Sequence, residues 1–111
     1  MPAYIVGHVT ITDPDIYREY VKHTPRLIAD HGGRFLIRGG EKSILEGPAD
    51  PRRVVVIEFP DRAAAEAFYH GGAYAPVRAI RHSASSGSMM IVDGFDASAW
   101  QAAVTESRKQ A

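Results

Sequence analysis

Apolar and polar positions alternate along residues 3–12, which predicts a strand with two different faces. Asp13 and Pro14 follow, and this pair suits the cap and the first residue of a helix. Apolar residues at helical spacing extend that helix to about His31. Pro25 removes one backbone hydrogen bond inside it and is expected to kink it.

The rest of the chain contains further apolar segments separated by glycine, proline and polar residues. In chain order, the segments predict a strand Arg34–Arg38 with pairing extended through Ser43, Ile44 and Leu45, a strand Arg53–Phe59, a helix from Asp61 to Gly71, a helical segment Tyr74–His82, and a strand Met89–Val92. The third strand has an unbroken apolar run, which is typical of a central strand covered on both faces.

The resulting order, β-α-β-β-α-β, predicts an α+β, ferredoxin-like fold. In that fold a four-stranded antiparallel sheet of order 4-1-3-2 carries two helices on one face. The other face stays bare and partly apolar, so we expect a homodimer through this face. Residues 1–94 form this domain, and residues 95–111 are a C-terminal extension. The extension is either a short helix pinned by Trp100 or a frayed tail, especially past Glu106.

Composition and charge narrow the possible partners. Among the 111 residues, 13 Lys and Arg balance 13 Asp and Glu, so nucleic acid is not an expected partner. Cysteine is absent, which excludes disulfides and thiolate metal sites. No signal peptide and no apolar run of about 20 residues is found, so we expect a cytoplasmic protein without membrane contact.

Three ionisable residues, His8, Arg38 and Glu58, lie inside strand-like apolar segments. Strand order 4-1-3-2 and side-chain alternation could bring all three together on the bare face. There His8 would move a proton, Glu58 would orient it, and Arg38 would bind a carboxylate or an enolate oxygen. The alternative is a structural Arg38–Glu58 ion pair with His8 as a hydrogen-bonded neighbour.

Other candidates could surround such a site. Tyr20 and His23 lie three residues apart on the first helix and could edge a pocket, although His23 could equally face solvent. Arg34 has the parity of Arg38 and is expected to add ligand-binding charge on the same face, unless it reaches solvent. The five histidines form no recognisable ligand pair, so neither a metal nor another cofactor is expected.

Several stretches together resemble a known family. They are Met1-Pro2-Ala3-Tyr4-Ile5-Val6, Asp13-Pro14 with Tyr17 and Tyr20, Gly32-Gly33-Arg34-Phe35-Leu36-Ile37-Arg38-Gly39-Gly40, Val55-Val56-Ile57-Glu58-Phe59-Pro60, and Ala67-Phe68-Tyr69 with Tyr74. Over roughly residues 2–94 the chain is similar to the family called domain of unknown function 1330. The resemblance implies a dimeric α+β barrel, in which two sheets pack face to face around a cavity. The wider superfamily includes cofactor-independent monooxygenases, isomerases and heme-handling enzymes, but this family has no established reaction.

The sequence therefore predicts a homodimer that binds a small anionic, partly apolar organic acid between its sheets. If it is an enzyme, it would act by cofactor-independent acid/base chemistry through His8, Arg38 and Glu58. The alternative is a non-enzymatic metabolite-binding module or a structural dimer module, in which the same residues serve recognition or packing.

Overall fold

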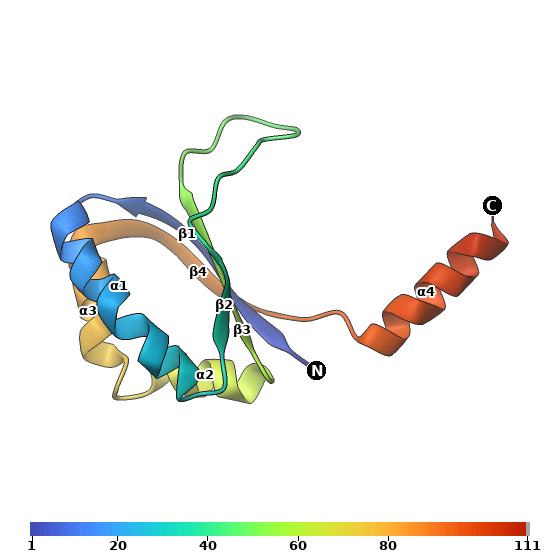
Figure 1. Ribbon diagram of the computed structural model, residues 1–111. Helices are drawn as coiled ribbons and strands as arrows, with labels where there is room; N and C mark the ends of the chain where they lie inside the picture. The colour runs from blue at the N-terminus through green and yellow to red at the C-terminus, as the bar shows by residue number, and fades with distance from the viewer. Residues whose placement is uncertain (111) are drawn as a thin grey trace.

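The computed structural model describes residues 1–110 and shows an α+β fold built on one four-stranded sheet (Figure 1). Its elements are β1 (Ala3–Ile11), α1 (Pro14–Ala29), β2 (Arg34–Arg38), β3 (Arg53–Phe59), α2 (Arg62–His70), α3 (Ala75–Ala84), β4 (Ser85–Asp93) and α4 (Ala97–Lys109). The predicted β-α-β-β-α-β order is confirmed, and the predicted helix and helical segment after β3 correspond to α2 and α3.

The sheet is antiparallel and has the order β2-β3-β1-β4, which is the predicted 4-1-3-2 order read from the other edge. Rows of side chains cross it on each face. Phe35, Ile57, Ile5 and Ile91 lie opposite one another on successive strands and form one apolar row. This row faces the helices and supplies the floor of the core.

Helices α1, α2 and α3 cover that face, and their apolar stripes complete the core. Phe59 and Phe68 stack with ring centroids 5.3 Å apart, which joins β3 to α2. Two aspartates begin the helices as predicted: Asp13 accepts from the Ile16 N–H at 3.1 Å, and Asp61 accepts from the Ala64 N–H at 2.8 Å.

The fourth strand is longer than predicted and begins at Ser85 rather than at Met89. The side chains in the first half of β4 are largely exposed. Because β4 is an edge strand, it pairs there without an apolar pattern, and its first half can be polar. Gly87 lies in this half with φ of 148°, and a Cβ there would stand 2.0 Å from the His8 carbonyl oxygen. The close approach of β1 and β4 therefore requires glycine at this position.

A loop of residues 39–52 leads from β2 to β3, and the predicted pairing through Ser43, Ile44 and Leu45 is wrong. Leu45 is 93% exposed, so this loop buries little of its apolar content. The loop extends from the sheet at the upper edge of the molecule in Figure 1. Without a facing strand or helix, its apolar residues cannot stabilise a longer β2.

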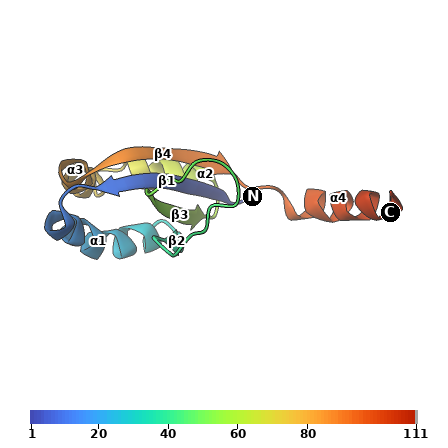
Figure 2. The ribbon, with the colours of Figure 1, turned by 90° about the horizontal axis from the view of Figure 1, so that it is seen from above.

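The C-terminal extension is helical as far as Lys109, beyond the predicted frayed end at Glu106. Trp100 is 57% exposed and therefore does not pin α4 to the domain. Figure 2 shows α4 standing away from the sheet and the other helices as a separate arm. Within residues 1–110, no helix is long and apolar enough to cross a membrane.

No helix of the described chain covers the second face of the sheet, as predicted. Ile37, Val56, Val6 and Met90 face one another across all four strands and form an apolar row on this face. Met90 is 54% exposed and Ile37 is 45% exposed. We call this surface the bare face.

Candidate ligand-binding site

A small cavity lies between the helices and the helix-facing side of the sheet, not on the bare face. Its volume is about 20 Å³, which is room for roughly one water molecule. Apolar side chains from the sheet and helices line most of it. The ionisable side chains in its wall are Tyr17, Tyr20, Tyr69, Tyr74, Arg38 and Arg53.

Arg38 reaches this cavity because β2 contains a bulge. Phe35 pairs with Ile57, but Ile37 pairs with Val56, so Leu36 has no partner on β3. The extra residue reverses the alternation, and Arg38 comes to lie opposite Val55, whose side chain is buried toward the helices. The prediction that Arg38 shares the bare face with His8 is therefore wrong.

Pro25 helps to hold the Arg38 guanidinium at the cavity. In a regular helix the Val21 carbonyl would accept from the N–H of residue 25, and proline has no N–H. The Val21 oxygen instead accepts from Arg38 Nη2 at 2.9 Å and from the Thr24 hydroxyl at 3.2 Å. The guanidinium also stacks over the Phe35 ring, 4.4 Å from its centroid.

Arg53 is a second cation in the wall, at the start of β3. Its guanidinium lies 5.9 Å from the centre of the Tyr17 ring, and its Nη2 donates to the Arg38 carbonyl at 3.4 Å. The buried Nε has no hydrogen-bond partner within the described residues. Gly39 has φ of 68° and makes room for this side chain, because a Cβ there would lie 2.1 Å from Arg53 Nη1.

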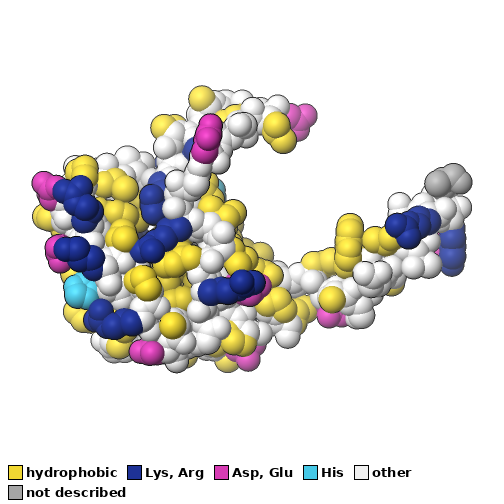
Figure 3. Space-filling model, viewed as in Figure 1, with side chains coloured by type: hydrophobic (Ala, Val, Ile, Leu, Met, Phe, Trp, Pro, Cys, Tyr) yellow, Lys and Arg dark blue, Asp and Glu magenta, His cyan; other side chains and the backbone are white. Residues whose placement is uncertain are grey.

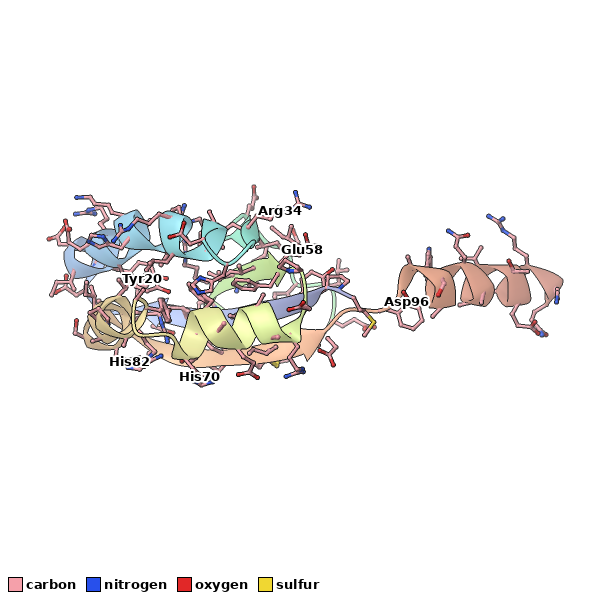
Figure 4. The ribbon with its side chains drawn as sticks, turned by 90° about the horizontal axis from the view of Figure 1, so that it is seen from below. Tyr20, Arg34, Glu58, His70, His82 and Asp96 are labelled. Atoms are coloured by element: carbon pink, nitrogen blue, oxygen red, sulfur yellow. The ribbon has the colours of Figure 1, made fainter. Side chains whose placement is uncertain are left out.

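Tyr20 and Tyr74 form a buried pair of hydroxyl groups, with 2.7 Å between their oxygens. Figure 4 shows Tyr20 between α1 and α3. Burial, reinforced by Tyr74, raises the pKa of Tyr20 far above its usual value. Burial also raises the pKa of Tyr17, against the opposing effect of Arg53. At neutral pH these phenols therefore keep their protons.

Arg81 lies on α3, close to the hydroxyl groups of Tyr20 and Tyr74, and is only 6% exposed. Burial acts to lower its pKa, but the oxygens of Tyr74 and Tyr20 outweigh that effect and raise it. Its Nη2 donates to the Tyr69 hydroxyl at 3.4 Å, and its Nε has no partner among residues 1–110. Arg81 is thus a charged group inside the core.

Donors exceed acceptors in this site. Among the ion pairs of residues 1–110, none includes Arg38, Arg53 or Arg81. Arg81 is buried and Arg53 is half-buried, and their neighbours are phenols, an imidazole and a backbone carbonyl, which compensate a desolvated cation less well than a carboxylate does. The site therefore favours a ligand that brings acceptor oxygens and negative charge.

His8, Glu58 and Arg34 lie on the bare face, away from the cavity. Glu58 pairs across strands with Tyr4, four residues from His8, which places the two side chains roughly 13 Å apart along the sheet. Glu58 instead accepts from Arg34 Nε at 3.2 Å and from the Tyr4 hydroxyl at 3.4 Å. The predicted meeting of His8, Arg38 and Glu58 is wrong, as is the shared face of Arg34 and Arg38. In Figure 4 the Arg34 and Glu58 labels lie well away from Tyr20.

The two remaining predicted candidates, Tyr20 and His23, do not lie in the same site. Tyr20 lines the cavity, whereas His23 does not and lies 3.0 Å from Arg26 Nη1 through its Nδ1. No three His, Asp or Glu side chains within the described chain are close enough to hold a metal ion together.

Arg53, Arg81 and Tyr74 are absent from the predicted site residues, although the sequence contains a signal for two of them. Arg53 has the parity of the buried Val55 on the same strand, and Arg81 shares a helical stripe with Val77. A cation on an apolar face needs an explanation: Arg53 lines the cavity, and Arg81 contacts the hydroxyl of Tyr69, another lining residue.

The family model of a domain of unknown function, DUF1330, matches residues 2–95. The chain belongs to the DUF1330 family. This match covers the sheet, α1, α2 and α3, and leaves α4 outside. No curated protein sequence matches the chain.

Solved structures show the same fold as this DUF1330 protein. A protein of unknown function from Rhodopseudomonas palustris aligns with a TM-score of 0.70 at 18% identity, covering 86% of this chain and 83% of that one. SnoaB, a cofactor-independent oxygenase from Streptomyces nogalater, aligns with a TM-score of 0.60 at 14% identity, covering 86% and 94%. At these identities the likeness concerns the fold alone.

Proposed function

We propose that the protein binds a small, partly apolar organic acid in the cavity between its helices and its sheet. The observation that carries this proposal is the set of three arginines, Arg38, Arg53 and Arg81, grouped around tyrosines without a carboxylate partner. A carboxylate entering the cavity would accept from guanidinium groups that protein atoms leave incompletely paired. This location replaces the predicted one between two sheets.

The wall of the cavity favours a planar ring as the apolar part of that acid. The rings of Phe35, Phe68 and the tyrosines line the cavity, and the Arg38 guanidinium lies over the Phe35 ring. Aromatic ligands pack well in such surroundings, and a planar guanidinium matches a planar carboxylate. The ligand class is therefore an aromatic or similarly flat carboxylic acid.

Ligand entry requires the cavity to expand, because about 20 Å³ does not hold a ring. The Arg38 side chain is exposed, and one hydrogen bond to the Val21 carbonyl oxygen fixes it at the cavity wall. A carboxylate can replace the carbonyl as the acceptor of Arg38 with little loss. Binding energy would then offset the cost of moving α1 side chains away from the sheet.

The chemistry of the wall supports binding more than acid/base catalysis. A general base works best with a pKa near the operating pH, and the lining contains no Asp, Glu or His. Tyr20 and Tyr17 hold their protons too tightly to serve at neutral pH. We therefore favour the non-enzymatic metabolite-binding alternative. Catalysis by His8 and Glu58 stays a prediction, and their placement on the bare face adds no support to it.

Benzoate, a small aromatic carboxylate, is a suitable probe of this proposal. We expect calorimetric titration to detect benzoate binding to the wild type and Arg38→Met to weaken it about tenfold, since a charge-assisted hydrogen bond contributes about 1.5–3 kcal/mol. The melting temperature without benzoate should stay near the wild-type value, because Arg38 is exposed.

Arg34→Met is the matched control for this experiment. Arg34 is a second arginine of β2, but it pairs with Glu58 on the bare face. Benzoate affinity should therefore be unchanged in this variant. If Arg34→Met weakens binding and Arg38→Met does not, the ligand lies on the bare face and the proposal is wrong.

We also propose that a second copy of the chain covers the bare face. The apolar row of Ile37, Val56, Val6 and Met90 crosses all four strands, and a contiguous exposed apolar surface of this kind is typical of an association site. Figure 3 shows a hollow beside the domain, between the projecting loop of residues 39–52 and the arm. A symmetric dimer would let each copy fill the hollow of the other.

A further inference from the structure

The Tyr20–Tyr74 pair contains one hydroxyl hydrogen more than it can use internally. Each phenol carries one hydrogen, and the 2.7 Å contact between the two oxygens accommodates one of them. The other hydrogen has no acceptor in the hydrogen-bond network of residues 1–110. Both side chains line the cavity, so an acceptor placed there is within reach of the spare donor.

Arg81 adds a positive charge directly behind this pair. Arg81 is only 6% exposed. Its Nη2 lies 3.4 Å from the Tyr69 hydroxyl oxygen and 3.3 Å from His82 Nε2. Neither neighbour is a carboxylate, and the buried Nε has no partner in the described chain. A buried cation of this kind strengthens any neighbouring hydroxyl as a donor and favours an anion beyond it.

We propose that Tyr20 and Tyr74, with Arg81 behind them, form a second oxygen-binding subsite, which takes a hydroxyl or oxo oxygen of the ligand. This inference rests on the proposed function, in which Arg38 and Arg53 bind the ligand carboxylate. The ligand class then narrows from aromatic acids to aromatic acids with a second oxygen, such as hydroxybenzoates. The subsite holds that oxygen in its more negative form, as a phenolate or a polarised carbonyl.

The two anchoring groups come from different elements. Arg38 and Arg53 project from β2 and β3, whereas Tyr74 and Arg81 belong to the α3 segment and Tyr20 to α1. A ligand that reaches both groups would bridge the sheet and the helix layer. Arg81 is a positioning residue in this scheme, because the hydroxyl groups stand between it and the ligand.

Benzoate and its three monohydroxy isomers form the probe set for this subsite. With the wild type, we expect one hydroxybenzoate isomer to bind about tenfold more tightly than benzoate, in proportion to one added hydrogen bond to a charged group. Tyr74→Phe and Tyr20→Phe keep the rings that pack in the core and remove one hydroxyl each. Each should abolish the preference, so that the variant binds benzoate and the three hydroxybenzoates with equal affinity.

Arg81→Met gives a second readout that packing alone would not change. In the wild type, the hydroxyl of the preferred probe should ionise at lower pH when bound than when free, which its ultraviolet absorbance reports. Arg81→Met should return this ionisation toward the pH of the free probe. It should also keep the fold, because methionine fills the buried volume and removes an uncompensated charge.

The outcomes separate this inference from the proposed function. If benzoate and all three isomers bind equally, the second subsite is wrong and the carboxylate site stands. If the hydroxyl preference survives in both phenylalanine variants, the tyrosine pair is not the subsite. If none of the four probes binds, the proposed function and the subsite are both contradicted.

Discussion

Single residues explain why this site carries positive charge without matching acids. Because Pro25 has no N–H, the Val21 carbonyl oxygen lacks its helical partner within α1. That oxygen accepts a hydrogen bond from the guanidinium of Arg38 instead. Gly39 leaves the space that Arg53 occupies. Neither residue would contact a ligand, yet each determines where a cation lies. Replacing Pro25 or Gly39 should therefore affect binding through the arginine that it positions.

Alkaline pH should destabilise the protein through Tyr20. Burial raises its pKa in the folded state above the ordinary value of 10.0, so above pH 10 the unfolded chain has lost a proton that the folded protein still holds. The free energy of unfolding then falls as pH rises. Between pH 9 and pH 11, Tyr20→Phe should make the total fall smaller by about 1.4 kcal/mol, measured by urea unfolding.

Val77→Ala is the control for this measurement, because it weakens the core and removes no titrating group. Its unfolding free energy should be lower at every pH, with the wild-type dependence on pH. An unchanged slope in Tyr20→Phe would show that the Tyr20 phenol is not buried as described.

The residue types of the site could be predicted from the sequence more readily than their placement. Arg38 and Tyr20 are conspicuous in their segments, and both reach the cavity. His8 and Glu58 are equally conspicuous and do not meet, because four residues of strand separate them. Cross-strand register determines which ionisable residues meet, and residue spacing along one strand does not reveal it.

At the scale of elements, the bulge in β2 is the decisive feature. Regular alternation would place Arg34 and Arg38 on one face, and the unpaired Leu36 sends them to opposite faces. Nothing in Phe35-Leu36-Ile37 marks a bulge in the sequence, since all three residues suit a regular strand. The bulge also places Ile37 in the apolar row of the bare face.

Deletion of Leu36 tests this register directly. Since Leu36 has no partner on β3, removing it should leave Phe35 opposite Ile57 and Arg38 opposite Val55. We expect the variant to fold, to lose at most about 1 kcal/mol of stability, and to bind benzoate like the wild type.

Deletion of Val56 is the contrasting case, because this residue is paired on both sides. Its loss should shift half of β3 by one residue, expose core side chains and unfold the protein. If the Leu36 deletion is equally damaging, as circular dichroism would show, then β2 has no bulge at this position.

The element order was predictable because alternation, helical spacing and caps agree over residues 3–94. The polar half of β4 and the length of α4 were not, for different reasons. An edge strand can pair without an apolar pattern, and a helix that stands apart buries no stripe that would define its end. In both cases the backbone forms structure where side-chain burial gives no signal.

At the scale of the whole molecule, the two faces of the sheet have separate roles in this account. The helix-covered face contains the cavity proposed to bind a ligand, and the bare face is the surface proposed to contact a second copy. The arm lies beyond the family match and exposes Trp100, the only tryptophan of the chain. The fluorescence of Trp100 therefore reports specifically on changes in the surroundings of α4.

Met90→Lys should separate the proposed dimer without unfolding it. The side chain is 54% exposed and belongs to the apolar row on edge strand β4, so a charge there would meet the apolar row of the other copy. Light scattering after size-exclusion chromatography should give twice the chain mass for the wild type and a single chain mass for the variant. A wild-type protein that is monomeric at high micromolar concentration would contradict the dimer.

Ile16→Lys is the matched control, since Ile16 is a similarly exposed apolar residue, at 41%, but lies on α1. This variant should remain a dimer. If it dissociates as well, the second copy contacts the helix layer rather than the bare face.

The proposed binding site would be visible directly in a crystal structure of the protein with benzoate. We expect the benzoate carboxylate within hydrogen-bonding distance of Arg38 or Arg53, with its ring between α1, α3 and the sheet. Benzoate bound on the bare face beside His8 and Glu58, or no bound benzoate at saturating concentration, would contradict it.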